Sequence, residues 1–160
     1  MSTYRWVESE VPRGLEIRQV YGFIFNPDGR IFLFEDEGRY NLPGGKPENH
    51  ESNSETLIRE VAEEVQITIT APTYLGYQLI KGDENFAQVR LIALIDQIFP
   101  TTFDPSTGRG YSRLWVPPIR ANDLLEWGES GRQQISSSII AASKFGVNWH
   151  GSPREYIEVN

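Results

Sequence analysis

The 160-residue sequence contains no cysteine and only two histidines, His50 and His150. The absence of cysteine excludes disulfides, zinc sites built from thiolates, and catalysis by a cysteine nucleophile. Two histidines are too few for a site in which several imidazoles bind one metal ion. The common sulfur-rich and histidine-rich metal sites are therefore ruled out.

Long hydrophobic runs and an excess of positive charge are also missing. The densest apolar stretch, residues 91–95, has the length of a strand, whereas a membrane span needs about 20 apolar residues. Residues 1–8 lack the apolar segment of a signal peptide, and we expect a cytoplasmic protein that does not bind membranes. The net charge of -7 disfavours binding of long nucleic acid. A small polyanionic substrate suits this charge if a metal cation supplies the missing positive charge.

Hydrophobic patterning predicts one domain of mixed α and β structure, with hairpins joining most of its strands. Residues 1–17 are interpreted as a polar lead-in, because Pro12 and Gly14 discourage regular structure. Residues 18–146 form the expected domain, and residues 147–160 a C-terminal tail. The expected elements are a hairpin of strands at 20–25 and 30–34, a helix beginning near residue 52, strands at 67–70, 74–80, 88–99 and 114–116, and a helix at about 131–144. The last helix is expected to turn Ile135, Ile139, Ile140 and Ala142 toward the core, and Gly146 follows its end.

The first expected helix begins at a capping box, Ser52 with Glu55, and carries three glutamates on one stripe. At about 100° per residue, Glu60, Glu63 and Glu64 lie together beside the apolar face. Repulsion between such neighbours costs a few tenths of a kcal/mol per pair, which either water or a bound divalent cation relieves. Several carboxylates on one rigid element suit Mg²⁺ or Mn²⁺ better than zinc. A solvated surface face is the alternative explanation of the stripe.

Around this helix the sequence resembles the Nudix hydrolase family. That family carries a box written G-x5-E-x7-R-E-U-x-E-E-x-G-U, in which U is a bulky aliphatic residue. The segment from Gly45 to Ile67 matches every specified position except the last glycine, which is Gln66. Glycine there lets the backbone leave the helix with positive φ, so Gln66 predicts a local change at the helix exit with the chemistry retained. The resemblance covers residues 18 to about 146.

The resemblance implies a Nudix-type α/β/α sandwich around a mixed β-sheet and hydrolysis of a phosphoanhydride bond in a nucleoside diphosphate linked to another group. The substrate is expected to be a small nucleotide-like pyrophosphate. The cofactor would be Mg²⁺ or Mn²⁺, held by the implied ligands: the carbonyl of Gly44 and the carboxylates of Glu60, Glu63 and Glu64.

The resemblance also implies the catalytic residues, which are Glu60, Glu63 and Arg59. Arg59 would hold the glutamates in place, and Glu51 would support the loop before the helix. Glu60 is the leading candidate for the general base. Some members of the family use a carboxylate from a later loop instead, and Asp104 is the only carboxylate that residues 101–112 offer.

Substrate contacts outside the box are weaker predictions. Arg109 and Arg113 are candidates for binding phosphate, with exposed loop charges as the alternative. Tyr40 and Phe86 lie next to predicted loops and are the preferred aromatic residues for stacking on a base. Other aromatic residues at strand spacing are more often part of a core, and these are Tyr21, Phe23, Tyr77 and Trp127.

Two rival functions share the same box. Isopentenyl diphosphate isomerases resemble this segment, but their chemistry uses a cysteine, which this chain lacks. A catalytically silent Nudix-fold module that binds nucleotides and regulates is the other rival, and the three retained glutamates favour an enzyme over it. The sequence leaves the choice of nucleotide open, and the oligomeric state as well, a homodimer included.

Overall fold

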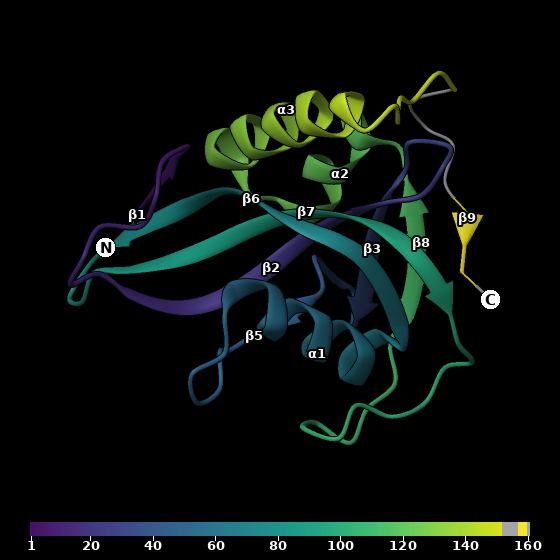
Figure 1. The fold of residues 1–160 in the computed structure, drawn as a ribbon, viewed down its shortest axis with the longest axis horizontal. Coiled ribbons are helices and arrows are strands. Elements are labelled where there is room, and N and C mark those ends of the chain that lie inside the picture. The colour runs from purple at the N-terminus through teal and green to yellow at the C-terminus, as the bar shows by residue number, and fades with distance from the viewer. Residues whose placement is uncertain (152–156, 160) are drawn as a thin grey trace.

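The computed structural model describes residues 1–151 and 157–159, which form a mixed sheet between helices (Figure 1). Helix α1 (Asn53–Val65) covers one face of the sheet, and α2 (Pro118–Leu125) and α3 (Gly128–Lys144) cover the other. This arrangement confirms the predicted mixed α and β sandwich. The strands of the described residues are β1 (Thr3–Val7), β2 (Glu16–Phe25), β3 (Ile31–Asp36), β4 (Arg39–Asn41), β5 (Gly44–Gly45), β6 (Ile67–Lys81), β7 (Phe86–Ile98), β8 (Ser112–Val116) and β9 (Ile157–Glu158).

The sheet runs in the order β1-β6-β7-β2-β3-β8-β9, with β2 and β7 parallel. The predicted hairpin between β2 and β3 pairs only next to its turn, at Phe25 and Ile31. Beyond that pair the two strands diverge. The short strand β5 pairs with β2 in this opening, with Gly44 opposite Tyr21, and β4 pairs with β3. The opening brings a glycine-rich loop into the middle of the sheet.

Alternate residues of the central strands pack on opposite faces, as the two-residue period of a strand requires. On β2, Ile24 joins the core beneath α1 with Leu57. Its neighbour Phe25 joins the core beneath α2 and α3 with Ile135. The chain therefore has two apolar cores, and the sheet separates them.

The strands expected at 67–70 and 74–80 form the single strand β6, and β1 and α2 are elements that the sequence-based expectation lacks. The lead-in contains β1, which pairs with β6 along the edge of the sheet, Tyr4 lying opposite Ile80. Pairing with an existing edge gives this polar segment its backbone hydrogen bonds, which local patterning does not reveal. Helix α2 is the second difference, because two consecutive prolines after β8 indicate the end of a strand and not the start of a helix. Pro118 instead occupies the first turn of α2, where a proline is tolerated.

The inner face of α3 is more polar than predicted. Ile135 and Ala142 are buried as expected, but Ile139 and Ile140 are 41% and 59% exposed. The face that meets the sheet carries Ser130, Gln134 and Ser138 at four-residue spacing, all of them buried. Gly146 follows the helix with a positive φ of 79°, as expected for a residue after a C-terminus. In the part of the chain that the structure describes, the helices are too short or too polar to cross a bilayer.

Candidate active site

Helix α1 is fixed at its start by the predicted capping box. The Ser52 hydroxyl accepts a hydrogen bond from the Glu55 backbone N–H at 3.1 Å. The Glu55 carboxylate in turn accepts one from the Ser52 N–H at 3.2 Å. Leu57 and Val61 are fully buried beneath the helix. The apolar face therefore sets the rotation of α1, and the glutamate stripe lies toward the loop that contains β5.

Two glycines let the backbone of β5 approach these glutamates closely. A Cβ added to Gly45 would lie 2.4 Å from the carboxyl carbon of Glu60. Gly44 has a φ of 148°, and a Cβ there would lie 2.1 Å from the carbonyl oxygen of Val20. The N–H of Gly44 donates to Glu64 Oε1 at 3.1 Å. Only glycine fits at either position without moving the carboxylates or the strand.

Arg59 ties the box together through one guanidinium group. Its Nε and Nη2 donate to the two oxygens of Glu51 at 2.7 and 3.0 Å. Its Nη1 donates to Glu60 at 3.0 Å and Glu63 at 3.2 Å. The paired hydrogen bonds from Arg59 lower the pKa of Glu51 to about 2. Arg59 therefore positions two of the predicted ligands and anchors them to the preceding loop.

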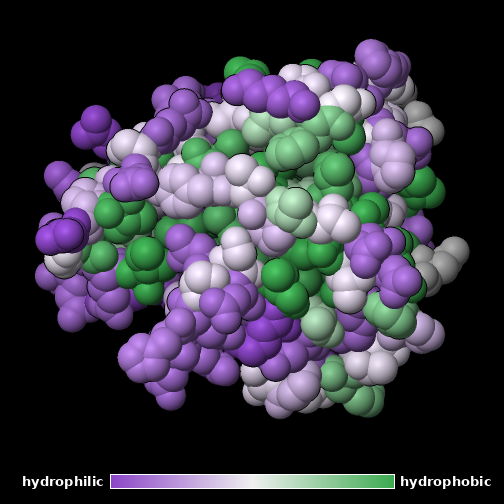
Figure 2. Space-filling view, in the orientation of Figure 1, coloured by the Kyte–Doolittle hydropathy of each residue, from purple (hydrophilic) through white to green (hydrophobic). Residues whose placement is uncertain are grey.

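The carboxylates of α1 lie in a partly dry and negatively charged environment. The pKa of Glu64 is raised to about 8, chiefly by burial, with the charges of Glu60 and Asp104 contributing to the shift. Burial is also the main cause of the raised pKa of Glu60, with Glu63 and Asp104 contributing. Such a cluster is unfavourable unless its oxygens take up a proton or a cation. The surface over β5 and the start of α1 is mainly hydrophilic (Figure 2).

Asp104 joins this cluster from the loop between β7 and β8. The residue is 5% exposed, and its two carboxylate oxygens accept hydrogen bonds from the Ser106 N–H at 2.9 Å and the Tyr111 hydroxyl at 3.4 Å. Its charge acts on both Glu60 and Glu64. The sequence indicates Asp104 only as an alternative base, and in the structure its charge raises the pKa of both glutamates.

These residues fit a divalent cation in their chemistry, although their side chains do not yet converge. Within residues 1–151 and 157–159, no three acidic or histidine side chains already surround one point as a metal site. The reason is visible in the contacts, since Arg59 draws Glu60 and Glu63 while Gly44 holds Glu64. Carboxylate oxygens are the ligands that hard divalent cations prefer, and this group carries more negative charge than Arg59 alone can balance.

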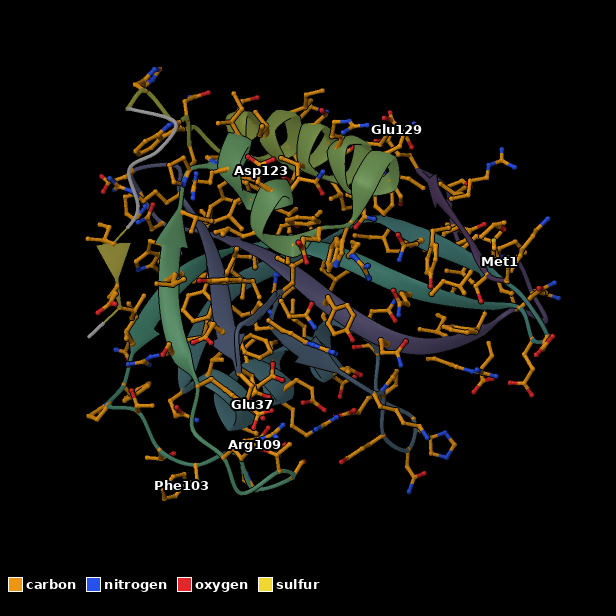
Figure 3. The ribbon with its side chains drawn as sticks, turned by 180° about the vertical axis from the view of Figure 1, so that it is seen from behind. Met1, Glu37, Phe103, Arg109, Asp123 and Glu129 are labelled. Atoms are coloured by element: carbon orange, nitrogen blue, oxygen red, sulfur yellow. The ribbon has the colours of Figure 1, made fainter. Side chains whose placement is uncertain are left out.

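The two predicted phosphate-binding arginines have other contacts. Arg113 is 3% exposed, and its Nη1 donates to the carbonyl oxygens of Val65 at 3.0 Å and Phe99 at 2.9 Å. Its predicted role in phosphate binding is corrected, because the side chain is buried and holds the end of α1 to the end of β7. Arg109 is half exposed and pairs with Asp36 at 2.8 Å. Figure 3 shows it next to Glu37, and phosphate binding by Arg109 stays a prediction.

Gln66 ends α1 in the left-handed conformation that glycine was expected to provide. Its φ is 54° and its ψ is 50°, so the predicted local change at the helix exit is wrong. The side chain compensates for the strain. Its amide donates to the Glu63 carbonyl at 3.0 Å and accepts from the Thr102 N–H at 3.1 Å. The second bond also fixes the loop that carries Asp104.

A cavity of about 420 Å³ lies on the sheet face that α2 and α3 cover, and its lining residues are Tyr4, Tyr21, Asn41, Gln78, Gln88, Glu126 and Trp127. Tyr21 connects the cavity to the glutamates. It is paired with Gly44 across β2 and β5, and its pKa is raised chiefly by burial and also by the charges of Glu64 and Glu60.

The preferred stacking residues do not line this cavity. Tyr40 packs against the core beneath α2 and α3. The ring of Phe86 lies 4.3 Å from the guanidinium of Arg18. Tyr21 and Trp127, which strand spacing assigns to a core, take their place at the cavity.

The NUDIX domain model matches residues 16–137. The chain therefore belongs to the Nudix hydrolase family. No curated protein matches it by sequence.

Solved structures with the same fold are distant in sequence. An Ap4A hydrolase from C. elegans in a binary complex has a TM-score of 0.62 at 14% identity, covering 81% of this chain and 98% of that one. A NUDIX hydrolase from Nitrosomonas europaea has a TM-score of 0.60 at 19% identity, covering 84% and 92%. A mutant of the Bacillus subtilis pyrophosphohydrolase BsRppH has a TM-score of 0.55 at 23% identity; the alignment covers 62% of this chain and only 63% of that protein. These likenesses show the fold.

Replacing Gln66 with glycine is expected to lower stability, although glycine is the family's residue at this position. The change relieves a left-handed conformation that costs about 1 to 2 kcal/mol. It also removes two largely buried hydrogen bonds worth about 0.5 to 1.5 kcal/mol each and gives the unfolded chain more freedom, at about 1 kcal/mol. Urea unfolding should show a net loss of about 1 kcal/mol, and a gain in stability would show that the two bonds contribute nothing.

Replacing Glu64 with glutamine is expected to stabilise the metal-free protein more at pH 9 than at pH 5. The folded-state pKa of Glu64 is raised, so its favourable contribution is present at low pH and is lost as the pH rises through about 8. Glutamine does not titrate and keeps an acceptor for Gly44. The stability difference between variant and wild type should grow by roughly 3 to 4 kcal/mol between these pH values. Glu37→Gln, on an exposed turn, is the control, and a difference for Glu64→Gln that stays constant with pH contradicts the assignment.

Proposed function

We propose that this Nudix hydrolase uses a divalent cation to hydrolyse a phosphoanhydride bond in a nucleoside diphosphate linked to another group. One observation carries the proposal. The carboxylates of Glu60 and Glu64 lie against the backbone of Gly44 and Gly45, and Tyr21 connects that position to a cavity large enough for a base.

The chain's own residues divide the work of the reaction. When bound, Mg²⁺ or Mn²⁺ supplies positive charge that neutralises the diphosphate and activates the attacking water. Glu60 and Glu64 would hold it, with Glu63 assisting and the Gly44 carbonyl as a further ligand. Arg59 keeps Glu60 and Glu63 oriented through its hydrogen bonds.

The bond changes follow from this arrangement. A water oxygen attacks one phosphorus, the bridging P–O bond breaks, and its electron pair leaves with the second phosphate. The water's proton passes to a carboxylate. Glu60 is our leading candidate, and Asp104 is the alternative. Asp104 comes from a separate loop and is not among the proposed ligands, so as the alternative base it would accept the proton without releasing the cation.

A small nucleotide is the substrate class that the cavity supports. Its volume of about 420 Å³ matches one base with part of a sugar rather than a polymer. The structural neighbours include an Ap4A hydrolase and a UDP-X diphosphatase, which agrees with a nucleotide substrate.

The net charge of -7 supports the expectation that long nucleic acid is not bound. A cytoplasmic location and a homodimer stay predictions, the latter testable by light scattering.

Glu60→Gln and Glu64→Gln are each expected to reduce turnover by about 100-fold or more, because each removes a proposed metal ligand. The thermal midpoint should stay unchanged or rise, since repulsion within the cluster falls. The assay follows hydrolysis of nucleoside triphosphates, sugar nucleotides, ADP-ribose and dinucleoside polyphosphates with Mg²⁺ or Mn²⁺, with products identified by mass.

Glu37→Gln serves as the matched control, because it removes an exposed carboxylate outside the cluster. Full metal-dependent activity in both cluster variants would overturn the ligand assignment. Nucleotide binding by the wild type without hydrolysis of any substrate in the panel would instead favour the catalytically silent regulatory module.

A further inference from the structure

Beneath the cavity lies Arg90, a fully buried guanidinium on β7 that forms no salt bridge in the described part of the chain. It lies between two aromatic rings, with its central carbon 5.0 Å from the centre of Tyr21 and 4.9 Å from that of Trp127. Burial lowers the pKa of Arg90 to about 10, so the group stays charged at neutral pH. Its Nη1 is buried and has no hydrogen-bond partner. Burying a charge without a counterion costs free energy of folding. A role in ligand recognition would explain why the group is present.

Side-chain amides surround the guanidinium, and their contact with it determines which way each amide group is oriented. Arg90 Nε donates to Gln134 Oε1 at 2.8 Å, and Nη2 donates to Gln88 Oε1 at 3.3 Å. A guanidinium has donors only, so the amide oxygens must face it and the NH₂ groups must point away. The same direction continues outward. Gln78 donates to Gln88 Oε1 and Gln88 donates to Gln19 Oε1, each at 3.0 Å.

Helix α3 completes the chain of amides with its polar inner face. Gln134 Nε2 donates to Gln78 Oε1 and to the Ser130 hydroxyl, both at 3.0 Å. Ser130 donates to Gln78 Oε1 at 2.8 Å. The amide oxygen of Gln78 therefore accepts two hydrogen bonds, as does that of Gln88. The amide oxygens of Gln78 and Gln88 therefore already have protein donors and are not available to accept hydrogen bonds from a ligand.

What remains for a ligand is a set of N–H donors. Gln78 and Gln88 line the cavity, and each NH₂ group has a second hydrogen beyond the one used in the network. Asn41 also lines it, and its side-chain oxygen accepts from the Leu42 N–H at 2.9 Å, which leaves its NH₂ group. Glu126 is the one carboxylate among the lining residues, and it is exposed. The floor of the cavity is thus rich in donors.

We propose that this cavity selects bases that present carbonyl oxygens, such as uracil, guanine and hypoxanthine, over bases with an amino group in the same position. Arg90 is the positioning residue that sets this selectivity, because its charge orients the amides of Gln78 and Gln88. The inference rests on the proposed function in taking the cavity as the base subsite. The rings of Tyr21 and Trp127 provide flat apolar surface beside it.

Matched substrate pairs test the proposal on the wild-type protein. Inosine and adenosine nucleotides differ in a carbonyl or amino group at position 6 and in the proton on N1, and uridine and cytidine nucleotides differ in the same way at position 4 and N3. With the same phosphate group, the carbonyl member of each pair should have a kcat/KM at least about tenfold higher, because a donor facing an amino group leaves buried groups unpaired. Equal values, or a preference for the amino members, overturn the proposal.

Gln88→Glu gives a sharper test within the site. The carboxylate pairs with Arg90 and replaces an NH₂ donor with acceptor oxygens only. We expect the preference to shift at least about tenfold toward the amino bases, mostly in KM, with kcat little changed. Gln133→Glu adds the same charge on the exposed face of α3 and should leave the preference unaltered. An unchanged preference in Gln88→Glu, or an equal loss for all four bases, contradicts the proposal.

Arg90→Gln provides an independent variant in case Gln88→Glu does not fold. Without the guanidinium the amides are free to turn, and the ratio of kcat/KM within each pair should fall toward one while the kcat of the better substrate is kept. An equal loss for both members of a pair would show that Arg90 binds phosphate or only supports the fold.

Hydrolysis and base selection fail separately in these experiments. If the wild type hydrolyses nothing, the binding of the four nucleotides by calorimetry still measures the preference. If it hydrolyses the nucleotides of all four bases equally well, the proposed function stands and the inference about Arg90 is wrong.

Discussion

The site depends on the contact between the carboxylates of α1 and the backbone of Gly44 and Gly45. That contact exists because β2 and β3 separate beyond Phe25 and Ile31 and leave room for β5. It also requires two residues without side chains, since a Cβ on either glycine would collide with Glu60 or with β2. Once the carboxylates are held there, burial and mutual repulsion make a cation the natural partner of their oxygens.

The supporting interactions are of different kinds. Burial of Leu57 and Val61 sets the rotation of α1, and the capping box fixes its first turn. At its end, Gln66 and Arg113 hold the helix to the loop and strand that follow. Arg59 then links the glutamates to Glu51 and thus to the preceding loop. The acidic cluster is therefore held from both ends of one short helix.

Much of the site could be predicted from the sequence, because the spacing of the box determines which residues share a helix face. Helical spacing predicts that Glu60, Glu63 and Glu64 share one stripe with Arg59 beside it, whereas their roles in the reaction stay predictions. The mixed fold and most strands followed from the period of the apolar residues. The burial of Arg113 could not be foreseen, because an arginine in a loop-rich segment is usually exposed. The position of Asp104 depends on the path of a loop without regular structure, which has no sequence period.

The residues around the cavity could not be predicted from the sequence. Tyr21 and Trp127 come from distant segments, and their meeting around Arg90 depends on how α3 packs on the sheet. The inner face of α3 is polar because it solvates a buried guanidinium, so apolar periodicity placed Ile139 and Ile140 toward the core incorrectly. Helix α2 begins with a proline, which in sequence patterning indicates a terminator. In each case a tertiary contact outweighed the local signal.

The most direct test of the central claim is a crystal structure grown with Mn²⁺ and examined by anomalous scattering. The account predicts a strong peak between the carboxylates of Glu60 and Glu64, beside the backbone of Gly44. A fully occupied manganese elsewhere, with these two side chains still turned toward Arg59 and Gly44, would contradict it.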